Sequence, residues 1–241
     1  MLSTLKMLAM NQMASGQFPT TVINEVDGIY QNVHTITPTY LVCLILNELR
    51  ERSRSHYLLD QIVRKGAGFL VNMSYVDPIS GLRVWHFNSF YQPDWEETAW
   101  CSYLAYRLGL VSKKELKPLR DLAFADETHN QGVGVWLKDS YSAKNRDNNV
   151  FDPVVSLSVS QFLSRIFNEK SGPTNDFLRM AIQARKESLY YANNFRDFFF
   201  YLFGLGPRPS FKNEKCQLFH HGNRTEVWYA SADVWEAAKL I

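Results

Sequence analysis

Three carboxylates within four residues make the stretch QPDWEETAW, residues 92–100, the part of this sequence best suited to acid chemistry. Adjacent carboxyl groups raise one another's pKa, so one of them can stay protonated and act as a proton donor. Asp94, Glu96 and Glu97 are therefore candidate catalytic residues, and we expect burial in an apolar cavity to raise the pKa of Glu96. The same residues also fit a helix start, because Asp94 and Glu97 have the spacing of an N-cap and its reciprocal partner. Both interpretations stay open.

Aromatic side chains next to turn residues form the second group of candidates. Their ring faces could stabilise a positive charge or hold an apolar substrate, although aromatics at helical spacing more often pack in a protein core. Polar residues near helix starts and in loops could orient an acid or bind an anionic group, although they serve equally well as helix caps or solvated surface residues. The candidate substrate-binding residues are Trp85, His86, Trp100, Asn149, Asp152, Tyr191, Arg224, Trp228 and Tyr229.

A metal site is the weakest of the chemical hypotheses. Cys216, His220 and His221 are close enough in sequence to suggest a shared Zn²⁺, but a fourth ligand is not evident and adjacent histidines rarely bind one ion together. We therefore expect neither a metal nor a cofactor.

Apolar residues recur at three- and four-residue spacing along most of the chain, which predicts an all-α protein. No segment alternates convincingly as a strand would. One further segment, residues 190–202, fits a buried helix and a short strand equally well. The expected helices cover a first segment near the N-terminus and then residues 40–49, 56–70, 97–108, 113–124, 154–167, 176–184 and 230–240.

The helix starts recur after roughly 37 to 58 residues, which is the length of a helical hairpin. If such hairpins close into a ring, the inner helices point their N-termini at one mouth, where the positive ends of their dipoles would stabilise carboxylates. We therefore expect one α/α-toroid domain over residues 1–241, with the candidate residues converging around an apolar cavity at that mouth.

Bulk composition excludes several classes of protein. A formal charge of +2 from well-mixed charges gives no basic field to attract nucleic acid. No apolar run approaches the ~18 residues of a membrane span, and the N-terminal segment is too interrupted for an export signal. Three scattered cysteines suggest a reducing compartment, so we expect a cytoplasmic protein.

Several motifs, in this order along the chain, resemble a known family: SGQF, VWHF, PDWEETAW, VWL, NNVFDPVVSLSVSQFL, FHHG and WYASADVWEAA. They are similar to the single-barrel members of the terpenoid cyclase and protein prenyltransferase superfamily, an α/α-toroid fold that includes the squalene–hopene cyclases. In the class II cyclases an acidic element of this type protonates an alkene or epoxide. Carried over by position, the resemblance makes Glu96 the proton donor, flanked by Asp94 and Glu97.

The sequence departs from the family in four ways. The family acid is ordinarily Asp, whereas Glu96 is one methylene longer and intrinsically weaker by about 0.4 pK units. Squalene cyclases have two toroids, and this chain has room for one. We also expect the ring to lack the outer helix that would follow residue 241. Neither the zinc pattern of the prenyltransferases nor the aspartate-rich metal box of the class I synthases is present.

Three functions follow from these observations. The leading hypothesis is a class II terpenoid-cyclase-like enzyme that protonates an isoprenoid or comparably apolar substrate. The alternative is a non-catalytic toroid that binds a lipid, a peptide or a partner enzyme. The third is a carbohydrate-active α/α barrel, which ranks last because its paired acids normally lie on opposite sides of a cleft.

Overall fold

The computed structural model describes residues 1–24, 30–33, 35–52, 56–78, 80–86, 93–128, 132–135, 137, 151–186, 188, 193–207, 219–220, 227–230 and 232–240. The described helices are α1 (Leu2–Asn11), α2 (Thr37–Arg52), α3 (Tyr57–Met73), α4 (Trp95–Arg107), α5 (Lys113–Asp126), α6 (Pro153–Phe162) with its π-helical extension η2 (Leu163–Phe167), α7 (Gly172–Gln183), α8 (Asn193–Leu202) and α9 (Ala232–Ala238). The described strands are β1 (Thr20–Asn24), β2 (Tyr30–Val33), β3 (Tyr75–Val76), β4 (Arg83–Val84), β5 (Glu127–Thr128), β6 (Gly132–Val133), β7 (Phe219–His220) and β8 (Val227–Ala230).

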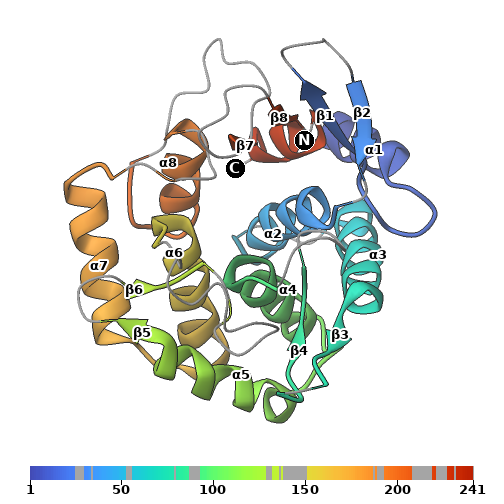
Figure 1. Cartoon of the computed structure of the whole chain (residues 1–241). Coiled ribbons are helices and arrows are strands. Elements are labelled where there is room, and N and C mark those ends of the chain that lie inside the picture. The colour runs from blue at the N-terminus through green and yellow to red at the C-terminus, as the bar shows by residue number, and fades with distance from the viewer. Residues whose placement is uncertain are drawn as a thin grey trace. The chain divides into compact units, whose positions relative to one another are not determined.

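The protein belongs to the all-α class, as the apolar periodicity predicted, and Figure 1 shows that helices make up most of it. Each helix expected from the sequence is present with boundaries shifted by a few residues. The ambiguous segment 190–202 contains helix α8, so its helical alternative was right. Among the described residues, no helix has both the length and the apolar character needed to cross a bilayer.

The chain forms two compact units. The first contains residues 1–69 and 187–241, and the second contains residues 70–186. The boundary falls inside α3, so the second unit begins with the last turn of that helix and ends after α7. The single toroid domain expected over residues 1–241 stays a prediction.

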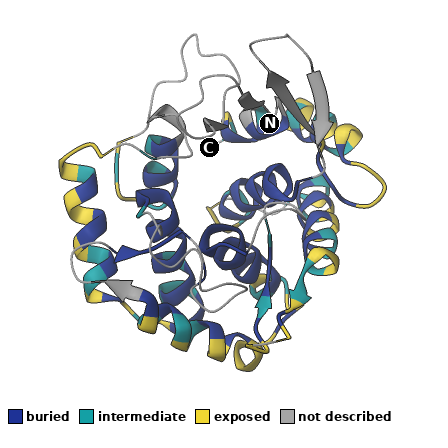
Figure 2. Ribbon diagram, in the orientation of Figure 1, coloured by how far each residue is buried: buried dark blue, intermediate teal, exposed yellow. Residues whose placement is uncertain are grey.

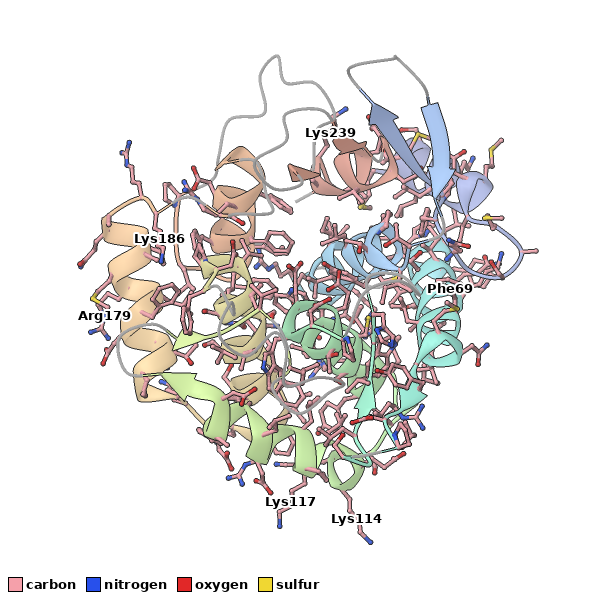
Figure 3. All side chains as sticks on the ribbon, in the orientation of Figure 1. Phe69, Lys114, Lys117, Arg179, Lys186 and Lys239 are labelled. Carbon is pink, nitrogen blue, oxygen red and sulfur yellow. The ribbon has the colours of Figure 1, made fainter. Side chains whose placement is uncertain are left out.

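In the second unit, two helices are buried and two others have one exposed face. α4 is buried from Trp95 through Ala105, and α6, which packs against it, is buried from Pro153 through Ser160. Figure 2 shows the contrast with α5 and α7, which carry exposed residues along their outer faces. Lys114 and Lys117 on α5 point outward in Figure 3, as amphipathic helices require. The helices that carry the candidate acids are thus the buried ones.

Short strands were not expected, and they connect the helices in both units. In the first unit, four antiparallel strands form a sheet in the order β2-β1-β8-β7, with Thr21 opposite Asn32 on one side and Ala230 on the other. In the second unit, β3 pairs with β4 and β5 pairs with β6. The sequence gave no strand signal because most of these strands have only two residues, too few to show an alternating pattern.

In the first unit, α2 is the buried helix, with no exposed position from Thr37 to Glu48. α9 packs against both α2 and α1, and the side-chain amide of Asn11 donates a hydrogen bond to Oδ1 of Asp233 over 2.8 Å. α3 approaches α2 so closely at Gly66 that a Cβ there would collide with Sγ of Cys43. Close packing at Gly66 therefore depends on the missing side chain.

Candidate functional site

The first turn of α4 carries three buried carboxyl groups, and we call residues 94–97 the acidic turn. Asp94, Glu96 and Glu97 are only 4%, 6% and 5% exposed. Ionised carboxylates are rarely buried unless they have partners, because removing their charge from water is costly. Three of them within four residues make this the most unusual electrostatic environment among the sequence-predicted site residues that the structure describes.

Asp94 caps the helix, as its spacing to Glu97 predicted. It has extended backbone angles, φ −122° and ψ 163°, and its Oδ1 accepts a hydrogen bond from the backbone N–H of Glu97 over 2.9 Å. The structural interpretation of this stretch is therefore confirmed for Asp94. It leaves open the chemical interpretation, since a capping carboxyl can still bind a proton.

Burial raises the pKa of Asp94 from its ordinary value of 3.8 to about 6. A hydrogen bond from the Glu97 side chain and one from the Glu97 backbone oppose this effect, and the negative charge of Glu96 adds to it. Two carboxyl groups can share a hydrogen bond only when one of them is protonated. The pair formed by Asp94 and Glu97 therefore keeps a proton to a higher pH than an isolated carboxyl group would.

A short segment that follows β6 links the starts of α4 and α6. The N–H of Trp95 donates to the carbonyl of Val135 over 2.9 Å, and the N–H of Leu137 donates to the carbonyl of Pro93 over 3.4 Å. Next to Val135, Gly134 pairs with Phe151, two residues before α6 begins. The structure thus brings the two helix starts to one segment.

Asp152, one of the candidate binding residues, lies at the second of these starts. Its Oδ1 accepts hydrogen bonds from the N–H of Val154 over 2.7 Å and from that of Val155 over 3.4 Å, and the residue is fully buried. The starts of α4 and α6 are therefore both capped by buried aspartates. Asp152 thus caps the helix whose start is tied to the same segment as the acidic turn.

Asp126 is a site residue that sequence reasoning missed. It is the last residue of α5, only 3% exposed, and its Oδ2 accepts a hydrogen bond from Nε1 of Trp95 over 3.0 Å. Trp95 stands between Asp94 and Glu96, so the bond connects α5 directly to the acidic turn. The available signal was an indole within the acidic stretch, because a buried indole N–H needs an acceptor.

The aromatic candidates of the second unit are packed into its interior. Trp85 is fully buried; its Nε1 donates to the carbonyl of Leu70 over 2.7 Å, and its backbone N–H donates to Oγ1 of Thr98 over 3.2 Å. The ring of His86, which is partly exposed, stacks on Tyr75 with centroids 4.4 Å apart. Trp85 therefore has a structural role, because its backbone hydrogen bond to Thr98 links it to α4.

Trp100 lies one helical turn after Glu96, on the same face of α4. Its ring meets the ring of Tyr103 edge to face, at a centroid distance of 6.3 Å, and both residues are fully buried. Nη1 of Arg165, on η2, donates to the hydroxyl of Tyr103 over 3.0 Å. An acid followed by two rings therefore occupies one stripe of the helix.

The remaining candidates cannot be placed next to this cluster. Asn149, Tyr191 and Arg224 lie outside the described residues. Trp228 and Tyr229 belong to β8 in the first unit, and only their backbone is described. The convergence of all the candidates on one apolar cavity stays a prediction.

No group of three or more His, Cys, Asp or Glu side chains suited to a metal ion occurs among the described residues. Cys216 and His221 from the proposed zinc cluster lie outside them. The polar side chains of the acidic turn are carboxyl groups that take part in hydrogen bonds, and such groups are suited to proton transfer.

Comparison with known proteins finds a similarity of fold. No protein-family model matches the sequence, and no curated protein matches it. The structure is similar to the crystal structure of a protein from Actinoplanes, with a TM-score of 0.54 and 13% sequence identity over 82% of this chain. The chain spans 58% of the length of that protein.

Proposed function

We propose that this protein is a class II terpenoid-cyclase-like enzyme, in which Glu96 protonates an isoprenoid or comparably apolar substrate. The main support is the burial of Asp94, Glu96 and Glu97 in one helical turn, where burial raises the pKa of Asp94 and its side chain shares a hydrogen bond with Glu97. A proton donor strong enough to attack an alkene must be shielded from water, which would otherwise level its acidity and capture the cation. The burial of all three carboxyl groups meets this requirement.

The proposed step breaks the O–H bond of the Glu96 carboxylic acid and forms a C–H bond at one alkene carbon of the substrate. The electron pair of the alkene makes the new bond, and the adjacent carbon becomes a carbocation. The ring of Trp100, on the same stripe of α4 as Glu96, would stabilise this charge, whereas the ring of Tyr103 already lies under the guanidinium of Arg165. A C–H bond of the cyclised cation then breaks, its electron pair forms the alkene of the product, and the released proton returns to the Glu96 carboxylate, so the overall reaction is an isomerisation.

The helical class and the alternation of buried and amphipathic helices in the second unit support the α/α-toroid part of the proposal. We also propose the cytoplasm as the location. The two described cysteines, Cys43 and Cys101, are free thiols, which is typical of a reducing compartment.

The test is a search for cyclised products from a panel of prenyl diphosphates and free polyenes, with Glu96→Gln as the decisive variant. The amide keeps the shape of the side chain but cannot supply the proton, so we expect turnover to fall by roughly 10²- to 10⁴-fold. The matched control is Glu115→Gln, which removes an exposed carboxyl group from the start of α5 and should leave turnover unchanged. Unchanged turnover of Glu96→Gln would remove Glu96 from the mechanism.

A second candidate, a non-catalytic binding protein, is favoured by a different observation. Trp85 and Trp100 have no exposed surface, and Asp94 already serves as a helix cap. If these are their only roles, no substrate gives a product, and Glu96→Gln behaves like the wild type in every assay. Mass spectrometry of the lipids that copurify with the protein would then identify the bound compound.

A further inference from the structure

Three contacts that the structure describes tie the start of α4 to other elements, two of them at the acidic turn and one at Pro93 next to it. Two are backbone hydrogen bonds, from Trp95 to Val135 and from Leu137 to Pro93. The third is the side-chain bond from Nε1 of Trp95 to Oδ2 of Asp126. This third contact is made between side chains, so substitution can remove it without altering the backbone.

The geometry of the third contact gives it control over the acids. Trp95 lies between Asp94 and Glu96, and its side chain is fully buried, so its ring has little room to turn without moving the backbone that carries both acids. Asp126 is equally well anchored, since it ends α5 and leads directly into β5, which pairs with β6 (Figure 1). The bond therefore joins two firmly held elements.

We propose that Asp126 is a positioning residue, whose side chain fixes the orientation of the acidic turn through the indole of Trp95. Its effect on turnover rests on the proposed function, because it acts by aiming Glu96 and touches no substrate itself. The effect on the geometry of the turn does not depend on catalysis. It can therefore be measured separately.

Four variants of the full chain separate the contributions. Asp126→Ala removes the acceptor, Trp95→Phe removes the donor but keeps an aromatic ring, and the double variant removes both. Asp126→Asn keeps a carbonyl oxygen that can accept from the indole, so it is the conservative variant. Asp121→Ala on the exposed face of α5 is the matched control, since its side chain is 54% exposed.

The first measurement is hydrogen exchange at the Glu97 amide, which Asp94 caps. We expect exchange there to speed up roughly 10-fold or more in Asp126→Ala and in Trp95→Phe, as the loss of a buried hydrogen bond allows the turn to open. In the double variant this amide should exchange little faster than in either single variant, because both substitutions remove the same hydrogen bond. Asp126→Asn and Asp121→Ala should match the wild type, and amides of α7 should be unaffected throughout.

The second measurement is steady-state turnover. We expect Asp126→Ala to lower kcat by roughly 10- to 100-fold with little change in KM, since misaligning a donor affects the transition state more than substrate binding. Asp126→Asn should restore kcat, which a general loss of stability would not predict.

The outcomes distinguish this inference from the proposed function. If Glu97 exchanges at the wild-type rate in both Asp126→Ala and Trp95→Phe, the positioning role is wrong even when the wild type is active. If the wild type forms no product but the exchange pattern holds, the positioning role stands and the cyclase proposal falls. If Asp126→Ala does not fold, the exchange rate of the Glu97 amide in Trp95→Phe tests the positioning role, with Asp126→Asn as the variant that should match the wild type.

Discussion

The raised pKa of Asp94 predicts how the stability of the protein depends on pH. Its folded value is about 6 and its ordinary value is 3.8. At about 1.4 kcal/mol per pKa unit, the difference amounts to about 3 kcal/mol. Between these two pH values the folded protein binds more protons than the unfolded chain, so the free energy of unfolding falls as pH rises. The contribution is complete below about pH 4 and is lost by the time the pH has passed 6.

The perturbation that isolates this effect is Asp94→Asn. Asn is as good an N-cap as Asp, so the helix start is retained while the titrating group disappears. We expect the free energy of unfolding of the wild type, relative to this variant, to drop by about 3 kcal/mol between pH 4 and pH 8, which corresponds to roughly 6–12 °C in Tm for a chain of this size.

Urea titrations of both proteins at several pH values make the measurement, and taking the difference cancels the titrating groups that do not interact with Asp94. Glu115→Gln is the sign control, because hydrogen bonds from Ser112 lower the pKa of Glu115 and its contribution is lost as pH falls. If the free energies of unfolding of the wild type and Asp94→Asn differ by the same amount from pH 4 to pH 8, the pKa of Asp94 is not raised.

Three further predictions concern packing, a thiol and a cap. Gly66→Ala should destabilise the protein by about 1–3 kcal/mol in urea titrations, because its methyl group would collide with Sγ of Cys43, and Cys43→Ala should recover part of the loss; full stability of the single variant would contradict this. Burial raises the pKa of Cys43 to about 12, so in a Cys216→Ser background iodoacetamide at pH 8 should label Cys43 only after denaturation; labelling of the native protein would disprove it. Asp152→Ala should lower the free energy of unfolding by about 1–2 kcal/mol through loss of the α6 cap, whereas Asp152→Asn should lose much less, and equal losses would exclude a capping role.

The helices could be predicted because their signals are local. Apolar spacing located α3, α5 and α7, whose one exposed face makes the pattern clear. The buried helices were harder to recognise as buried, since α4 and α6 contain Thr, Ser and Glu among their buried residues. The division into two compact units leaves no mark in composition, because the boundary lies within a regular helix.

The contacts that shape the candidate site are mostly non-local, so the sequence did not specify them. Asp126 is 31 positions from Trp95. Their meeting depends on how the α4–α5 hairpin and the β5–β6 pair fold back, which no spacing rule gives. The pairing of Gly134 with Phe151 links the starts of α4 and α6, and it too is a non-local contact that no spacing rule predicts. The sequence could suggest only that buried donors such as the Trp95 indole would need acceptors.

Two capping motifs in this chain show why a local pattern cannot decide between a cap and an acid. At the start of α5, Ser112 and Glu115 form an exposed capping box, and hydrogen bonds from Ser112 lower the pKa of Glu115. At the start of α4, Asp94 also accepts hydrogen bonds that lower its pKa, yet burial outweighs them and the net shift is upward. The spacing of three residues is the same in both. Burial raises the pKa at both sites, but it is the largest effect only at Asp94. The raised pKa of Asp94 therefore arises from the packing around α4, and the helix cap and the raised pKa are two consequences of one arrangement.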